Sequence, residues 1–239
     1  MLRKKALRKI LITTFSLFTL FVIYLIPTKI NDRYIGGDVE VEYTSNTTNQ
    51  EIYLLGDNSY LVKFHIFLED SSIEQQISTV LDYLKINSSK KLPDGLRGVI
   101  PEATSVLGVK VDGKSAILNF SKQLLEGEEK LEERMVEAIV YSVTALPEVD
   151  SVQIQVEGSP LLKLPKSGKV LEQELTRDFG INKVYDITNR NGIQKVTIYY
   201  LDKISNNNYY VPVTKYLNDD RDKIKIIIDN LASAYIHEE

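Results

Sequence analysis

The sequence has no cysteine, no tryptophan and only two histidines, His65 and His237. Without cysteine there is no disulfide, no thiolate metal ligand, no cysteine nucleophile and no lipid-modified N-terminal cysteine. The two histidines lie far apart in the chain, which disfavours a histidine-based zinc site. We therefore expect no metal, no cofactor and no catalytic residue, and we look for the function in the fold and its surfaces.

Basic tracts are also missing beyond the N-terminus. The net charge of the 239 residues is −4, and the first nine residues carry five of the positive charges, so the rest of the chain carries −9. An acidic body does not offer the basic surface that displaces counterions from nucleic acid, and we expect no nucleic-acid partner. With 43% hydrophobic and 26% charged residues, the composition is that of one large or two small folded domains.

One uncharged apolar run, ILITTFSLFTLFVIYLI, lies between Lys9 and Lys29. Its length and the basic residues 1–9 before it predict a transmembrane signal anchor at 10–27, with the tail cytoplasmic and the rest extracytoplasmic. The alternative is a cleaved signal peptide, but the exit sequence IYLIPTKI lacks the small residues of a cleavage site. A buried soluble helix is disfavoured because the run is apolar on all sides. The polar residues 28–50 are expected to be a tether.

The folded part begins with a predicted β-β-α unit. Residues 51–56 and 60–68 are rich in β-branched and aromatic residues and are separated by the turn sequence GDNS. A helix follows, with Ser71 or Ser72 as its N-cap. Its helically spaced apolar residues are Ile73, Ile77, Val80, Leu81 and Leu84.

The loop 86–105 comes next, and we interpret it as a surface crossover rather than a functional loop because it carries no cluster of catalytic residue types. The segment VLGVKV-DG-KSAILNF then predicts a hairpin, since Asp112-Gly113 can adopt the positive φ angles of a type I′ turn.

A long helix is predicted next and ends at Pro147, followed by a strand at 150–158. The helix has an apolar stripe formed by Leu131, Met135, Ala138, Ile139, Ser142, Val143 and Leu146. It also has an acidic run, Glu128, Glu129, Glu132, Glu133 and Glu137. We interpret the run as a solvated helix face, with a cation or partner site as the alternative.

The order β-β-α-β-β-α-β over residues 51–164 predicts an α+β domain with helices on one side of a small antiparallel or mixed sheet. The start of this pattern recurs at the end of the chain. YLVKFHIFLED (60–70) aligns with YVPVTKYLNDD (210–220), and the helix at 73–84 aligns with 220–231. Residues 165–194 are then a linker, and 195–239 are a partial β-β-α second copy.

Residues 101–158 resemble the repeat domain of the GerM family of sporulation and spore-germination proteins. The resemblance rests on PEAT followed by LGV, the Asp112-Gly113 hairpin, LNFS (118–121), EAIV (137–140) and the strand at 149–158. YYVPVTKYL in the tail resembles the second strand of the same domain. The resemblance covers about 51–164 as a full copy and 195–239 as a partial one.

This resemblance implies a non-enzymatic protein whose tandem domains lie outside a membrane, similar to ring-building motifs that associate side by side. It implies protein partners in the envelope or the sporulation channel complex, with self-association among them. The chain departs from the family in lacking a lipid-anchor cysteine and the second half of its second copy. We expect a chain cut short, with completion by a partner as the alternative. Residues 195–239 should pack poorly, lean on the first domain or need a partner chain.

Two other functions have less support in the sequence. A cell-wall enzyme would use Glu102, Asp112 or Glu126 as acid and base, or His65 in a nucleophile triad, but nothing in the sequence distinguishes these residues from turn, surface and strand positions. An extracytoplasmic ligand-binding or regulatory domain is the main alternative to an assembly protein.

Overall fold

The computed structural model describes residues 14–15, 17–18 and 47–232, and the chain divides into two compact units, 1–45 and 46–239. In the first unit the four described residues are helical. Most of the predicted anchor at 10–27, the basic tail 1–9 and residues 28–46 of the predicted tether lie outside the described residues. Within the described part of the chain, no helix is long and apolar enough to cross a membrane.

The second unit begins with the predicted β-β-α-β-β-α-β order. Its elements are β1 (Thr47–Leu55), β2 (Leu61–Glu69), α2 (Ile73–Tyr83), β3 (Val106–Asp112), β4 (Ser115–Phe120), a 3-10 helix (Lys122–Glu126), α3 (Glu129–Val143), β5 (Ser151–Val156) and the short β6 (Ser159–Pro160). Ser72 caps α2 by accepting a hydrogen bond from the backbone N–H of Gln75 at 3.4 Å. β1 starts earlier than predicted, so residues 47–50 pair with β2 and are not part of a tether.

The Asp112-Gly113 hairpin is confirmed. β3 and β4 pair antiparallel up to Asp112 and Ser115, and Gly113 has a φ of 60°. This left-handed backbone angle is the one for which glycine carries no steric penalty. The two turn residues are Gly113 and Lys114, and only Gly113 has a positive φ, which fits a type II′ turn and not the type I′ turn predicted at Asp112-Gly113.

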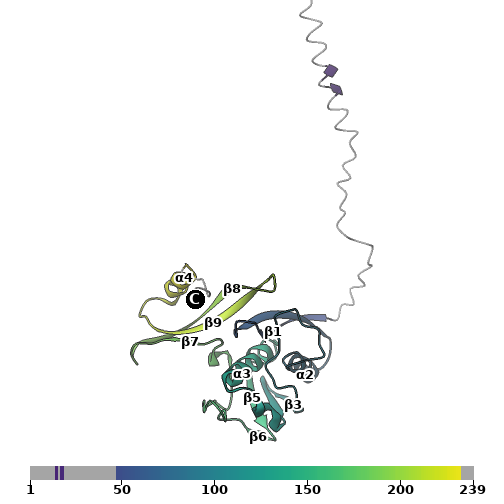
Figure 1. Cartoon of the computed structure of the whole chain (residues 1–239), viewed down its shortest axis with the longest axis vertical. Helices are drawn as coiled ribbons and strands as arrows, with labels where there is room; N and C mark the ends of the chain where they lie inside the picture. Colours follow the sequence, from purple (N-terminus) through teal and green to yellow (C-terminus); the bar gives the residue numbers. More distant parts are fainter. Residues whose placement is uncertain (1–13, 16, 19–46, 233–239) are drawn as a thin grey trace, which may run out of the picture. The chain divides into compact units, whose positions relative to one another are not determined.

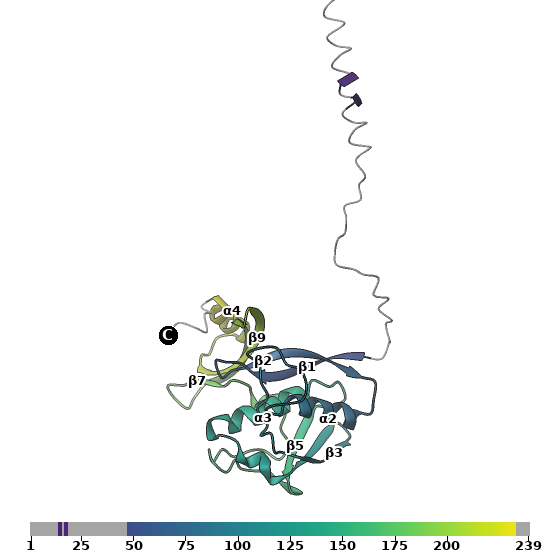
Figure 2. The same cartoon turned by 45° about the vertical axis from the view of Figure 1, so that its right-hand side comes forward.

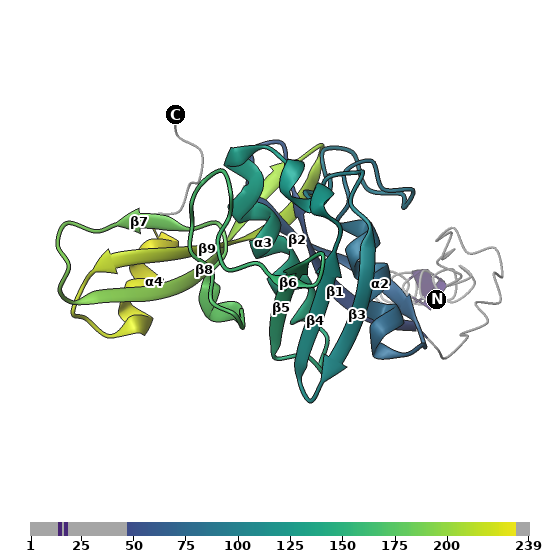
Figure 3. The same ribbon diagram turned by 90° about the horizontal axis from the view of Figure 1, so that it is seen from below.

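α2 and α3 lie between two sheets, not on one side of a single sheet as predicted (Figure 2). One sheet has the order β1-β2-β9-β7 with β8 on β9, where β7 is Val184–Asp186, β8 is Ile193–Ile204 and β9 is Asn207–Asn218. The other sheet has the order β3-β4-β5-β6 (Figures 1 and 3). α3 contacts β1 of the first sheet and β5 of the second, while α2 contacts β2 and β3. The apolar stripes of both helices are too wide for one partner, so a second sheet covers the remaining face.

The core confirms the predicted stripes. Ile77, Val80, Leu81 and Leu84 of the first helix region are fully buried, as are most apolar residues of α3. Ser142 of α3 is also buried, and its Oγ accepts a hydrogen bond from the backbone N–H of Tyr53 at 2.9 Å. α3 therefore covers the outer edge of β1 by hydrogen bonding as well as by packing.

The end of the chain forms the predicted β-β-α repeat. Its elements are β8 (Ile193–Ile204), β9 (Asn207–Asn218) and α4 (Lys223–Ala232). The linker before it contains a 3-10 turn (Arg177–Phe179) and β7 (Val184–Asp186). β8 and β9 form a hairpin with twelve paired residues, turned by Ser205 and Asn206 at φ 45° and 71°. Two successive positive φ angles are typical of a type I′ turn.

The predicted linker is more than a connection. β7 pairs parallel with β9, and Leu171, Leu175 and Ile181 are buried in the core. The second repeat thus leans on the first through the linker as well as through its own strands.

Candidate protein-interaction site

The carboxylates considered as acid–base candidates do not form one cluster. Glu102 and Glu126 line the same pocket, of about 220 Å³, together with six apolar side chains. Asp112 lies elsewhere, at the end of β3 opposite Ser115. All three carboxylates are exposed, and Glu102 accepts a hydrogen bond from Asn87 Nδ2 at 2.9 Å. Exposed carboxylates of this kind lack the contrasting environments that separate a general acid from a base.

His65 lies on the exposed face of β2. Its Nε2 is 3.8 Å from Glu51 Oε1, and Glu51 is in turn paired with Lys63. No hydrogen bond links a serine hydroxyl to this imidazole among the residues that the structure describes. The arrangement is a surface charge cluster on neighbouring strands, not a nucleophile triad.

The glutamate-rich part of α3 is not solvated throughout, which corrects the interpretation made from the sequence. The first two glutamates of the run are exposed, but Glu132 and Glu137 have only 4% and 0% of their surface exposed. Glu132 accepts hydrogen bonds from the backbone N–H groups of Lys166 and Ser167 at 3.1 and 2.7 Å. The run therefore fixes the linker on the helix.

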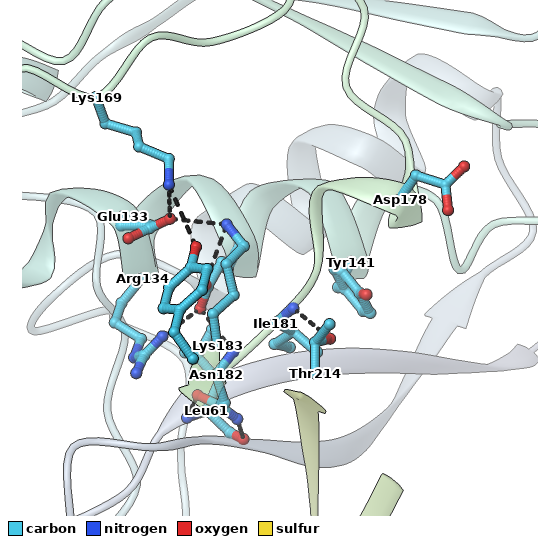
Figure 4. A network of polar contacts seen from close by, with 12 residues as sticks. Leu61, Glu133, Arg134, Tyr141, Lys169, Asp178, Ile181, Asn182, Lys183 and Thr214 are labelled. Atoms are coloured by element: carbon cyan, nitrogen blue, oxygen red, sulfur yellow. Dashed lines mark hydrogen bonds and ion pairs between the residues drawn. The ribbon is translucent and has the colours of Figure 1, made fainter. Parts of the chain in front are cut away.

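An ion cluster joins α3 to the linker one turn further on (Figure 4). Arg134 Nη1 donates to Glu137 Oε2 at 2.7 Å. Lys183 Nζ lies 2.8 Å from Glu133 Oε1 and 3.6 Å from Glu137 Oε1. Lys169 Nζ lies 3.2 Å from the same Glu133 oxygen. Two carboxylates of the helix thus meet two ammonium groups of the linker.

Burial decides the direction of the pKa shift at Glu137 and Lys183, whereas the neighbouring lysines decide it at Glu133. Burial raises the pKa of the Glu137 carboxyl, against the opposing charges of Arg134 and Lys183. It lowers the pKa of Lys183, although the charges of Glu137 and Glu133 act the other way. Desolvation also acts to raise the pKa of Glu133, but the hydrogen bond and charge of Lys183 outweigh it and lower that pKa. Because separating buried charges leaves each uncompensated, the cluster holds the linker in one position.

Asn182 is the central residue of the junction between the repeats. It is fully buried and has a φ of 49°, a left-handed conformation that asparagine tolerates better than most residues. Its side-chain oxygen accepts from the Leu61 N–H at 2.8 Å, and its amide donates to the Leu61 and Pro212 carbonyls, both at 2.7 Å. Its own backbone N–H donates to Glu137 Oε2 at 3.0 Å. One side chain therefore connects β2 of the first repeat to β9 of the second.

This bridge lies where strand pairing stops. β2 and β9 pair directly only at Lys63 and Tyr210. Pro212 follows Tyr210 by two positions on β9, and as a proline it has no N–H that could donate to β2. Asn182 supplies the missing donor and acceptor, and Ile181 exchanges hydrogen bonds with the backbone N–H and Oγ1 of Thr214 on β9. The junction is thus a strand ladder completed by a linker residue.

The helix of the second repeat has an uncovered apolar face. Ile224, Ile228 and Leu231 of α4 are 67%, 58% and 48% exposed. Their counterparts in the first repeat are Ile77, Leu81 and Leu84, which are fully buried. α4 packs on β8 instead, with Ile226 buried and Ile227 partly buried against the core. In the first repeat, the sheet of β3 to β5 and α3 cover the equivalent face.

Comparison with known proteins agrees with this architecture. The family described as "Germane: Sporulation and spore germination" matches residues 48–162. The solved structure of the tandem GerMN domains of the sporulation protein GerM from Bacillus subtilis is 30% identical, with a TM-score of 0.72, over 79% of this chain and 68% of that chain. The chain belongs to the GerM family. GerM-like proteins with GerMN domains are not a known enzyme family.

Two further GerM matches define the extent of the similarity. The spore germination protein GerM of Bacillus subtilis (strain 168) is 31% identical over 200 residues, which are 82% of this chain and 54% of that protein. The chain thus spans about half the length of this curated relative. The first GerMN domain of the sporulation protein GerM from Bacillus subtilis is 28% identical, with a TM-score of 0.51, and covers 55% of this chain and 99% of that domain.

Reasoning from the sequence missed the junction residues. Asn182 is one of several asparagines in a polar stretch, and no local pattern distinguishes it. A signal for the ion cluster was present, because the linker carries Lys166, Lys169 and Lys183 opposite the acidic run of a GerM-type helix. Complementary charge between a helix and a linker is a basis for predicting that the two lie together.

Proposed function

We propose that this chain is a non-enzymatic assembly protein of endospore formation or germination. It acts outside the cytoplasm as a scaffold or ring-associated component, and residues 10–27 anchor it in the cell membrane. The support is the similarity to GerM proteins across both repeats, together with an apolar N-terminal run preceded by basic residues.

The observation that carries the proposal is the uncovered face of α4. Contiguous apolar side chains on a folded surface mark sites of protein–protein contact. The face formed by Ile224, Ile228 and Leu231 occupies the positions that build the core in the first repeat. Because these side chains are as apolar as those of a protein core, we expect them to be more stable against another protein element than in contact with water.

The experiment is localisation and complementation in an endospore-forming host. A tagged protein should concentrate at the membranes of the developing spore, and its deletion should lower the yield of germinating spores. An Ile224→Lys, Ile228→Lys double variant should fail to complement, because it places charge on the docking face. Val170→Lys is the matched control, since Val170 is 74% exposed on the linker.

Even distribution over vegetative membranes, with no effect of deletion on spores, would count heavily against the role. Release of the protein from membranes by alkaline carbonate would count against the anchor alone. Full complementation by the double variant would show that the α4 face is not the docking surface.

A ligand-binding or regulatory domain is the second candidate. The pocket of about 220 Å³ favours it, because an apolar lining with four glutamates, among them Glu102 and Glu126, suits a small amphipathic cation. A compound of this class that raises the melting temperature should lose its effect when Glu126 is changed to Gln. If no such compound stabilises the protein, this second candidate fails.

A further inference from the structure

The two outer edges of the β1–β2 pair differ in how many of their backbone groups have hydrogen-bond partners. On the β1 side, the Tyr53 N–H donates to Ser142 Oγ of α3. Leu55 exchanges backbone hydrogen bonds with Arg97, at 2.8 and 3.0 Å. The outer edge of β1 is therefore occupied over its last residues by α3 and by the loop around Arg97.

On the β2 side, only the first third of the edge is occupied. Leu61 bonds to Asn182 through both its N–H and its C=O, and Lys63 pairs with Tyr210. Backbone groups of alternate residues point to the same side of a strand. The β1–β2 register runs without a shift, so the N–H and C=O groups of His65, Phe67 and Glu69 also point to this edge.

On the edge of β2 that faces away from β1, no strand in residues 47–232 pairs with β2 beyond Lys63. The Glu69 carbonyl accepts a hydrogen bond from Ser71 Oγ at 3.3 Å, and the other edge groups of this segment have no protein partner within the described residues. The segment HIFLE (65–69) contains no proline or lysine, two residues with which natural proteins commonly protect an exposed edge, and its one carboxylate, Glu69, is the last residue of β2.

The space beside this edge is open. A groove of about 390 Å³ runs between the end of β2 and the outer side of α2, and its lining includes Phe67, Glu69, Gln76, Thr79 and Tyr83. Phe67 is 73% exposed, which is unusual for a large apolar side chain in the middle of a strand. Backbone groups, an aromatic anchor and room for a strand thus coincide at one place.

We propose that this edge, residues 65–69 of β2, pairs with the same edge of a second copy of the chain. An antiparallel pairing centred on Phe67 makes the contact two-fold symmetric, as an isologous interface requires. It places the two Phe67 side chains opposite each other, and His65 of each copy opposite Glu69 of the other. An aromatic cross-strand pair stabilises a sheet, and a neutral imidazole N–H can donate a hydrogen bond to a carboxylate. The sequence of the edge is therefore complementary to itself.

The pairing goes beyond the proposed function and does not depend on a role in sporulation. It joins two copies into one continuous sheet and leaves the α4 face free for a different partner. A failure of the pairing would leave the assembly role through α4 intact, and a failure in the spore assays would leave the pairing intact.

The absence of cysteine makes the test direct, because a single introduced thiol has no competitor. In an antiparallel hydrogen-bonded pair the two Cα atoms lie about 5.5 Å apart, which is within the range that a disulfide spans. The full chain with Phe67→Cys, in detergent micelles under mild oxidation, should form disulfide dimers at least about tenfold faster than the full chain with Val170→Cys. Val170 is the control because it is equally exposed.

A second pair of variants tests the register. Chains with His65→Cys and chains with Glu69→Cys should cross-link to each other much faster than either cross-links to itself. Adding Phe67→Pro to both should abolish this cross-linking, since it removes an N–H that β1 does not use. If that variant fails to fold, Phe67→Lys supplies a charge that blocks the edge without altering the backbone.

Equal rates for the Phe67→Cys and Val170→Cys chains overturn the proposal, as does self-linking of His65→Cys as fast as mixed linking. Occupation of this edge by a segment of the same chain also overturns the proposal. In that case the amides of Phe67 and Glu69 exchange slowly with solvent at concentrations where the protein is monomeric.

Discussion

Replacement of Asn182 by alanine is the sharpest test of the junction between the repeats. The side chain makes three hydrogen bonds, to the Leu61 N–H, the Leu61 carbonyl and the Pro212 carbonyl, at 2.7–2.8 Å. Asn182 is fully buried, so the groups that lose their hydrogen-bond partner cannot simply bond to solvent water instead. Alanine also has to adopt the φ of 49° that this position requires.

The magnitude follows from these contacts. Leaving a buried polar group unsatisfied costs about 1–3 kcal/mol, and three groups lose their partner, so we expect a loss of about 3–6 kcal/mol after local relaxation. The left-handed backbone adds about 1–2 kcal/mol for alanine. Asn182→Gly avoids this second contribution and should be less destabilised than Asn182→Ala by about the same amount. Losses of this size are a large part of the total stability of a domain, about 5–15 kcal/mol.

The assay is equilibrium urea unfolding of residues 46–239, followed by circular dichroism. Asn206→Ala is the matched control, because Asn206 has a φ of 71° but is exposed in the β8–β9 turn. It should lose only the backbone contribution, about 1 kcal/mol. If Asn182→Ala and Asn206→Ala have the same stability, the three hydrogen bonds do not hold the repeats together and the reasoning is refuted.

Three further predictions concern separate parts of the structure. The pKa of Glu133 is lower in the folded protein than its usual value of 4.5, so the folded state binds fewer protons than the unfolded state and stability should fall as the pH drops below that value. Glu133→Gln should reduce this loss of stability at acid pH, and an unchanged loss would contradict the assignment. Leu81→Ala should lower the free energy of unfolding in urea by about 2–5 kcal/mol, whereas Ile228→Ala at the equivalent exposed position should lower it by less than about 1 kcal/mol. Equal losses would mean that α4 is packed like α2. Ser142→Ala should cost about 1–3 kcal/mol because the buried N–H of Tyr53 loses its acceptor, and a neutral effect would show that another group replaces it.

Much of the fold could be predicted from short-range patterns. The hairpin at Asp112-Gly113, the stripe of α2 and the strand at 151–156 all follow from alternation, helical spacing or turn chemistry. The β-β-α repeat was visible because its second copy preserves the same spacing of apolar residues. These signals are local, and the structure retains them because the packing around them does not oppose them.

The interactions that the sequence did not reveal are long-range. Glu132 and Glu137 belong to an acidic run that a solvated helix face would explain equally well, and only the path of the linker buries them. The sandwiching of the helices depends on β3 to β5 forming a separate sheet, which strand propensity alone does not specify. The exposed face of α4 was anticipated, since its partner elements in the first repeat have no counterpart in the described residues.

The nine-residue register between β1 and β2 has a mechanical consequence. β1 begins at Thr47, one residue after the start of the second unit, and it pairs with β2 along its whole length without a break. Hydrogen bonds between antiparallel strands run perpendicular to the strands. A pull along β1 from its N-terminal end therefore loads the whole ladder in shear at once, instead of opening it one bond at a time. The entry strand is thus built to withstand tension applied through the N-terminal segment.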